Sequence, residues 1–123
     1  MIYTSYFGKL KFLPKNIIPV AICGGLPPFY SGAWYKKLAP SWSIFREWKQ
    51  SYDETRYTER FSHEILDNLN PHEVVKELNE FIRNYPIDTD IALICYEKSG
   101  DFCHRHLVAN WLKDAGYDVK EFN

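Results

Sequence analysis

Short runs of apolar residues predict the strands of this chain. Residues 2–7 are β-branched and aromatic, and residues 17–23 are almost continuously apolar until two glycines end the run. Residues 90–96 repeat this pattern after Pro86, and residues 119–122 are predicted to form a final strand. Unbroken apolar runs are typical of strands that are covered on both faces, so we predict a parallel sheet.

Apolar residues that recur every three or four positions predict the helices. One such stripe runs through residues 53–69, and another begins at Pro71, where Asn70 is suited to cap the helix. A third lies in the last quarter of the chain and closes at Gly116. A shorter amphipathic helix is predicted for residues 41–49.

The order strand, strand, helices, strand, helix, strand predicts an α/β fold in which helical crossovers join parallel neighbours. We expect a small three-layer sandwich with a mostly parallel sheet flanked by helices. The chain has 123 residues, the length of one ordinary domain, and no linker or internal repeat interrupts it. Residues 1–123 are therefore predicted to form a single α/β domain.

The aromatic content of the chain is high for a small globular domain. With 46% hydrophobic and 25% charged residues the chain is globular, which excludes a disordered or fibrous protein. Aromatic residues make up 17%, more than a small core easily encloses. Four of them stand in the 12-residue loop at residues 24–35, and a loop this aromatic favours a binding role.

The charge balance excludes some partners. Fifteen basic and sixteen acidic residues give a net charge of -1, which argues against bulk binding of nucleic acid or of an anionic membrane. No stretch approaches the roughly 18 apolar residues of a membrane span. The opening residues lack a signal-peptide pattern, so a cytoplasmic location is predicted. Three cysteines are an odd number, and we expect them to be reduced thiols.

Reactive residue types cluster between the strand at residues 90–96 and the helix that follows it. Ligands of open α/β sheets bind outside the carboxyl ends of the strands, near helix N-termini. A helix that begins near Asp101 turns His104 into the core and directs His106 to solvent. The same geometry places Cys103 and Arg105 on either side of the buried stripe. The candidate catalytic residues are Cys103, Cys95, His104 and Glu97.

Three kinds of chemistry remain open for this cluster. A thiolate on Cys103 gains stability from the helix N-terminus and a neighbouring Arg or His. An anion such as phosphate fits the backbone N–H groups of the turn together with Arg105 and Lys98. A zinc ion would use Cys95, Cys103 and one histidine, with Cys23 from the neighbouring strand. The Cys-x7-Cys-His-x-His spacing is not that of a standard zinc finger, so we predict no metal and no cofactor.

Each of these residues also has a purely structural interpretation. Cysteine is among the most often buried residue types, so Cys95 and Cys23 can serve packing alone. His104 can satisfy a carbonyl group at a strand end, and Arg105 can belong to an ordinary ion pair.

The most distinctive motif is the Cys-x-Glu at residues 95–97 followed by the Cys-His-Arg at residues 103–105. Together with Thr-Ser-Tyr-Phe at residues 4–7 and Tyr-Lys-Lys-Leu-Ala-Pro at residues 35–40, it closely resembles the signature of the family named domain of unknown function 488. The resemblance covers nearly the whole chain and implies a small bacterial or phage α/β protein. It names no reaction and implies only these candidate site residues: Cys95, Glu97, Cys103, His104 and Arg105.

One departure from the family pattern affects the expected cleft. Many relatives carry an Asp-Val-Arg-like end to the second strand, where this chain has Ala21, Ile22 and Cys23. The cleft thereby lacks an acid and an arginine, so a ligand of those relatives need not be a ligand of this chain.

The leading hypothesis is a strand-end cleft that binds a small anionic ligand, of phosphate-bearing or nucleotide type. In this hypothesis Arg105 and helix N-terminal amides hold phosphate, while His104 and Glu97 orient the ligand or transfer protons. Rings of the aromatic loop stack on a base. The predicted ligand-binding residues are Arg105, Lys98, Ser99, Gly24, Gly25, Tyr30, Trp34 and Tyr35.

Two other classes of function stay open. One is a cysteine-dependent enzyme in which Cys103 or Cys95 attacks the substrate, with His104 as base and Arg105 stabilising charge. The other is a non-catalytic interaction module, of bacterial or phage origin, that docks the aromatic loop at residues 24–35 onto a protein. The residues do not choose between an enzyme and a binding protein, and they do not indicate an oligomeric state.

Overall fold

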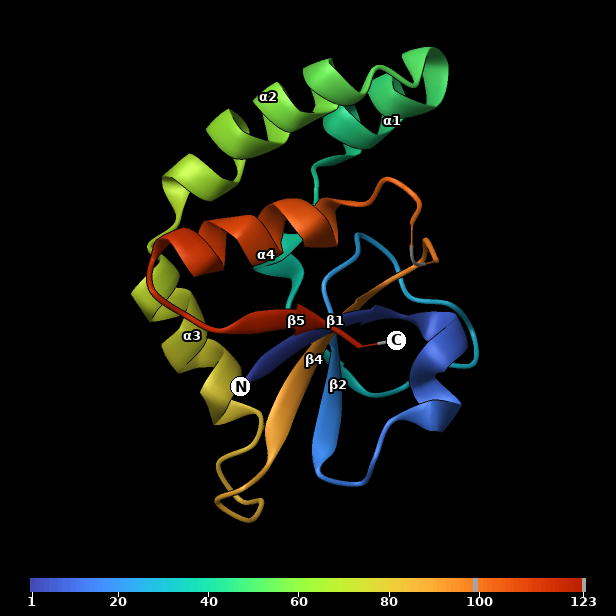
Figure 1. Ribbon diagram of the computed structural model, residues 1–123. Helices are drawn as coiled ribbons and strands as arrows, with labels where there is room; N and C mark the ends of the chain where they lie inside the picture. Colours follow the sequence, from blue (N-terminus) through green and yellow to red (C-terminus); the bar gives the residue numbers. More distant parts are fainter. Residues whose placement is uncertain (99, 123) are drawn as a thin grey trace.

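A computed structural model describes residues 1–98 and 100–122, within which five parallel strands form one sheet (Figure 1). The order across the sheet is β3-β2-β4-β1-β5. The strands are β1 (Ile2–Tyr6), β2 (Ile17–Ala21), β3 (Ala33–Trp34), β4 (Asp90–Cys95) and β5 (Val119–Glu121). The parallel sheet with its helices confirms the predicted small α/β sandwich.

The helices also follow the predicted order. They are α1 (Trp42–Ser51), α2 (Glu54–Glu64), α3 (Pro71–Glu80) and α4 (His104–Asp114), with 3-10 segments η1 (Phe7–Phe12), η2 (Lys36–Leu38) and η3 (Leu66–Asn68). The predicted start of α3 is confirmed, because the Asn70 side chain accepts hydrogen bonds from the backbone N–H groups of His72 and Glu73. No helix in residues 1–98 or 100–122 is both long and apolar enough to cross a membrane.

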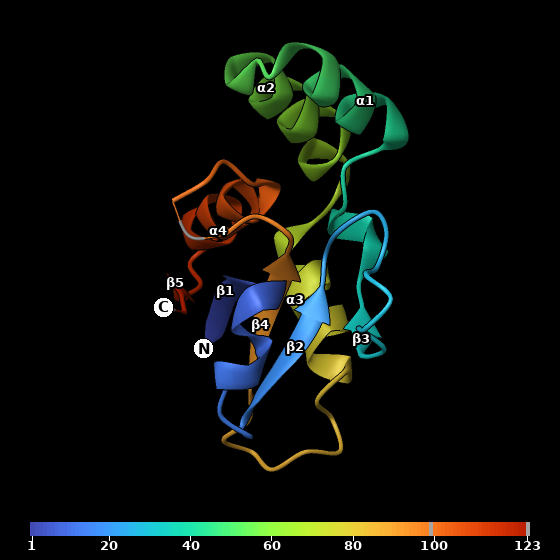
Figure 2. The same cartoon turned by 90° about the vertical axis from the view of Figure 1, so that its right-hand side faces the viewer.

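The two faces of the sheet are covered by different elements. Along β4 the side chains alternate, so that Ile91 and Leu93 enter one core while Ala92 and Ile94 enter the other. The first core receives apolar side chains of all four α-helices. The second lies under η1 and the loop around Tyr30. Figure 2 shows α3 behind the sheet and η1 in front of it.

Helices α1 and α2 form an antiparallel pair beyond the carboxyl ends of β2 and β4 (Figures 1 and 2). Ser41 caps α1 by accepting a hydrogen bond from the Ile44 N–H group. Tyr52 ends α1 in the left-handed conformation, with φ of 49°, and Asp53 then caps α2. The helix pair is held to the rest of the fold because Ile44 of α1 and Phe61 of α2 are buried in the first core.

Three details of the predicted elements need correction. The stripe over residues 53–69 is not one helix, because α2 ends at Glu64 and a 3-10 turn follows. Strand β3 was not predicted, since two residues are too few to show an alternating pattern. The last helix begins at His104 and not near Asp101.

Candidate functional site

The topology places a cavity at one point on the edge of the sheet. Strands β2 and β4 are neighbours, but the chain leaves β2 toward β3 and leaves β4 toward β5, on the opposite side. Ligands of open α/β sheets bind at such a switch point, outside the carboxyl ends of the strands. A cavity of about 740 Å³ opens there. The predicted catalytic residues and the two predicted glycines all line this cavity.

The strand ends and the first turn of α4 supply one side of the cavity. It is lined by Cys23, Gly24 and Gly25 after β2, by Cys95, Tyr96 and Glu97 at the end of β4, and by Cys103 and His104 at the start of α4. All four predicted catalytic residues and both predicted glycines therefore line one cavity.

Aromatic side chains supply the opposite side. They are Trp42, Phe45 and Trp48 of α1, Tyr57 of α2 and Phe102 before α4. The ring of Trp48 packs against Phe102, with centroids 4.9 Å apart, and against Tyr57 at 5.5 Å. Trp42 is 70% exposed, so its ring surface is available to a ligand.

Positive charge reaches the cavity from two lysines, Lys36 and Lys49. The ammonium group of Lys49 lies 5.4 Å from the centre of the Phe45 ring. Glu97 brings a negative charge to the same cavity. The pKa of Tyr57 is raised first by burial and then by the Glu97 carboxylate, so the phenol stays neutral at physiological pH.

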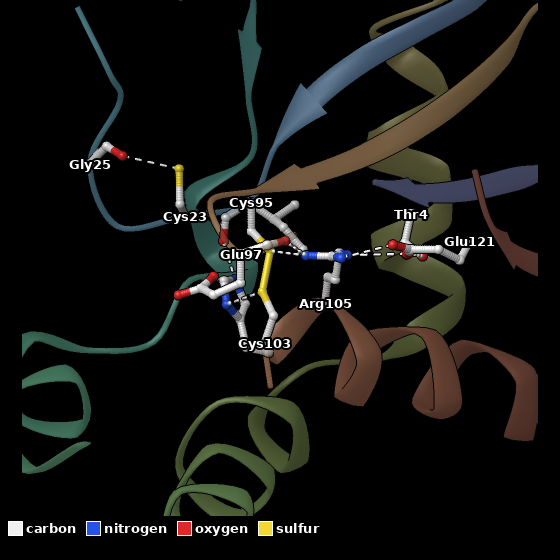
Figure 3. Close-up of a disulfide and its surroundings, with 10 residues drawn as sticks. Thr4, Cys23, Gly25, Cys95, Glu97, Cys103, Arg105 and Glu121 are labelled. Carbon is white, nitrogen blue, oxygen red and sulfur yellow. Dashed lines mark hydrogen bonds and ion pairs between the residues drawn. A yellow bond between two sulfur atoms is a disulfide. The ribbon is translucent and has the colours of Figure 1, made fainter. Parts of the chain in front are cut away.

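The two cysteines of the predicted cluster are joined by a disulfide (Figure 3). Reduced thiols were predicted from the odd number of cysteines, but that number does not show which of them meet in space. The end of β4 faces the N-cap position of α4, and this brings Cys95 to Cys103. Cys23 keeps a free thiol, which donates a hydrogen bond to the Gly25 carbonyl at 3.0 Å. Burial raises the pKa of the Cys23 thiol, so it stays protonated.

His104 points inward, as predicted, and its ring is held in one orientation. Its Nε2 atom lies 2.7 Å from the Ile22 carbonyl oxygen. A carbonyl oxygen only accepts, so Nε2 carries the proton and Nδ1 presents a lone pair. Nδ1 lies 3.8 Å from the Cys103 sulfur. Burial, with a smaller contribution from Arg105, lowers the pKa of His104 to about 4, which leaves the ring neutral at physiological pH.

Arg105 does not face the cavity, contrary to its predicted role in holding an anion. The side chain is fully buried, and its Nε and Nη2 groups donate to the Glu121 carboxylate at 3.1 and 2.7 Å. Nη1 donates to the Cys95 sulfur at 3.0 Å and to the Glu97 carbonyl (Figure 3). The guanidinium group thus links the turn after β4 to Glu121 on β5 through its hydrogen bonds. Helical geometry placed Arg105 beside the buried stripe, but β5 encloses that side as well.

His106 also differs from its prediction, since it is half-buried and not directed to open solvent. Burial lowers its pKa. Lys98 is exposed and does not line the cavity, and Ser99 lies outside the described residues.

The rings of the loop at residues 24–35 do not stack in the cavity. Tyr30 is buried, and its hydroxyl donates to the Ala33 carbonyl. Tyr35 is also buried and donates to Glu77. The indole N–H of Trp34 donates to the Cys23 carbonyl at 2.8 Å. These three side chains fix the loop, because each donates a hydrogen bond to a backbone carbonyl in or near a strand or to a carboxylate on α3.

Most of the aromatic cavity residues that sequence reasoning missed lie on α1, and Tyr57 of α2 and Phe102 before α4 were missed as well. Trp42, Phe45 and Trp48 recur every third position within the segment predicted as a short amphipathic helix. Only the large aromatic residues on one face of that helix signalled a binding wall.

The comparisons with known proteins give a family and no reaction. A family model described as "Active DUF488-N3 subclade" matches residues 27–116. The match includes every described residue that lines the cavity except Cys23, Gly24 and Gly25. No curated protein and no solved structure matches the chain.

Proposed function

Because the chain belongs to the DUF488 family, whose name assigns it no reaction, we propose from the site itself that the protein binds a small anionic ligand of the nucleotide class. The ligand occupies the cavity between the ends of β2 and β4 and helix α1. The observation that carries the proposal is the lining of this cavity, where aromatic rings and two lysines stand together.

The size and walls of the cavity suit such a ligand. Its volume of about 740 Å³ is within the range of about 300–1,000 Å³ that small-molecule sites show. The exposed ring of Trp42 offers a stacking surface, and stacking of a base on an aromatic ring contributes about 1–3 kcal/mol. The base therefore lies against α1 and not against the loop at residues 24–35.

In the folded protein, Lys36 and Lys49 bind the phosphate group of the ligand in place of Arg105. Arg105 is neutralised by Glu121, whereas the side chains of Lys36 and Lys49 are exposed. The N-terminus of α1 adds backbone N–H groups next to Ser41, on the same wall. In a ligand that has both a ring and a phosphate, the ring contacts the aromatic side chains and the phosphate contacts the lysines and the N-terminus of α1.

Titration with nucleoside monophosphates tests the proposal. Trp42 and Trp48 line the cavity, so binding is followed by tryptophan fluorescence and by thermal shift. We expect Trp42→Ala to weaken binding by about 5- to 150-fold, the equivalent of about 1–3 kcal/mol. Phe12→Ala is the matched control, since Phe12 is a 60% exposed ring away from the cavity.

The charge requirement is tested in the same assay. Lys49→Gln should weaken binding of the monophosphate and leave binding of the uncharged nucleoside unchanged, with Lys113→Gln as control. Absence of binding by all nucleotides, or equal binding by wild type and Trp42→Ala, contradicts the proposal.

A cysteine-dependent reaction is the second candidate. The hydrogen bond from Arg105 Nη1 to the Cys95 sulfur favours it, because a cation beside a sulfur stabilises the thiolate once the disulfide is reduced. We expect iodoacetamide to label Cys95 faster than Cys23 in the reduced protein at neutral pH. Labelling of Cys95 no faster than an ordinary thiol counts against this candidate.

Two further expectations remain predictions. Docking of the loop at residues 24–35 onto a protein has some support, since Phe29 in that loop is 71% exposed. A cytoplasmic location would keep the thiols reduced.

A further inference from the structure

We propose that, in the reduced protein, Cys95, Cys103 and His104 together bind one zinc(II) ion whose fourth coordination position faces the cavity. No metal was predicted from the sequence, because the spacing of these residues fits no standard zinc motif. The folded chain brings their donor atoms together all the same. This proposal does not depend on the proposed nucleotide ligand.

The three donor atoms converge on one small volume. The two sulfur atoms and a ring nitrogen of His104 lie within 4.8 Å of one another, and all three residues are buried. Ligand atoms that share a zinc ion at bond lengths of about 2.0–2.3 Å must lie this close. One sulfur comes from the end of β4, and the other two ligands come from the start of α4, so the backbone fixes their relative position.

The backbones of Cys95 and Cys103 are farther apart than an ordinary disulfide requires, so two separate thiolates fit at these positions. The Cα atoms of Cys95 and Cys103 are 7.5 Å apart, whereas disulfides usually span about 4.4–6.8 Å. Zinc binding requires both sulfurs as thiolates. A phosphine, together with one water molecule, reduces the S–S bond to two thiols and is itself oxidised to the phosphine oxide. The zinc ion then displaces one proton from each thiol.

His104 is oriented in the way that metal-binding histidines usually are. Such a ring donates its second N–H group to a carbonyl or carboxylate, which fixes the tautomer and the direction of the ligand nitrogen. In this chain the Ile22 carbonyl accepts from Nε2 at 2.7 Å. The lone pair of Nδ1 is left on the side of the Cys103 sulfur.

The surrounding charges balance those of the site. Two thiolates offset the charge of a zinc(II) ion, and the neutral imidazole adds none. Arg105 supports the Cys95 sulfur through Nη1, and its own charge is matched by Glu121. The buried cluster is therefore neutral as a whole, which avoids the large cost of an unpaired buried charge.

The fourth position is open to a ligand and not filled by a third cysteine. The side chain of Cys23 points away from the disulfide and toward Gly25 (Figure 3). Cys95, Cys103 and His104 all line the cavity, so an ion held by them meets whatever occupies it. Three protein ligands with one open position are typical of catalytic zinc sites, where the ion polarises a substrate or activates water. Glu97 lines the same cavity and is placed to accept a proton.

Metal uptake by the reduced full-length chain tests the proposal. We expect about one zinc ion per chain after reduction with a phosphine, addition of zinc and removal of free metal. Cobalt(II) in place of zinc should give the visible and thiolate charge-transfer bands of a tetrahedral site. Cys95→Ser and Cys103→Ser should lose these bands, and the matched control Cys23→Ser should keep them.

A second measurement uses only the wild-type chain, in case the variants do not fold. Zinc should slow alkylation of Cys95 and Cys103 but not of Cys23, and a chelator should restore the rate. The proposal is overturned if the reduced wild type takes up no metal, if its cobalt spectrum lacks thiolate bands, or if alkylation of the pair is unchanged. Nucleotide titrations of metal-free and zinc-loaded protein are separate assays, so failure of one proposal is distinguishable from failure of the other.

Discussion

Replacing Arg105 by Met removes a buried charge from the turn that carries Cys95 and Glu97. The Arg105 side chain is fully buried, and Glu121, its ion-pair partner, has a side chain that is 21% exposed. Methionine fills much of the same volume, so the main loss is the set of charged hydrogen bonds. After the change, the Glu121 carboxylate retains the hydrogen bond from the Thr4 hydroxyl at 2.6 Å.

The expected magnitude follows from this geometry. Removing one partner of a buried ion pair costs about 3–5 kcal/mol, because the other charge is left without its counterion. Glu121 keeps the hydrogen bond from Thr4 and is partly exposed to water, so we expect the lower end, about 3 kcal/mol in the free energy of unfolding. The corresponding fall in Tm for a chain of this length is roughly 10 °C.

Urea denaturation of a double-mutant cycle measures this effect. Arg105→Met and Glu121→Leu should each destabilise the protein, while the double variant should lose clearly less than the sum, because it removes both charges of the pair together. Arg56→Met removes one partner of an exposed pair, whose side chains are 55% and 35% exposed, and should cost below about 1 kcal/mol. A loss for Arg105→Met no larger than this control, or additive effects in the cycle, would refute the reasoning.

Three further predictions concern stability. Because the pKa of His104 is about 4 in the folded chain against an ordinary value of 6.5, the unfolded chain binds the proton first as the pH falls. The metal-free protein should therefore lose about 3 kcal/mol between pH 6.5 and pH 4, and urea titrations of His104→Gln should lack this slope. Asn70→Ala should lower the free energy of unfolding by about 1 kcal/mol, since two N–H groups of α3 lose their acceptor. An unchanged Tm would show that the Asn70 side chain does not stabilise the start of α3. Gly116→Ala should lower the free energy of unfolding by about 1 kcal/mol. The cause is backbone strain alone, because φ is 100° at this position and the added Cβ meets no atom. A gain in Tm would exclude such strain.

Local patterns were enough to predict most of the elements and part of the site. The apolar runs at β1, β2 and β4 identify strands because a strand buried on both faces needs apolar side chains at every position. Asn70 followed by Pro71 marks a helix start for reasons that involve only neighbouring residues. The inward direction of His104 follows from helical periodicity, and the parallel sheet then brings the end of β4 to the start of α4.

The sequence by itself therefore determined most of the strands and helices, and that Cys95, Glu97, Cys103 and His104 stand together at the carboxyl end of β4 and the start of α4. Only the tertiary structure decided which partners these residues meet. Periodicity says which side of a helix is buried, but it does not say what lies opposite, so the pairing of Arg105 with Glu121 on β5 was not visible. The aromatic wall of α1 depends likewise on the packing of α1 and α2 over the strand ends. Contacts between distant segments arise from the packing of whole elements, and no local pattern records that packing.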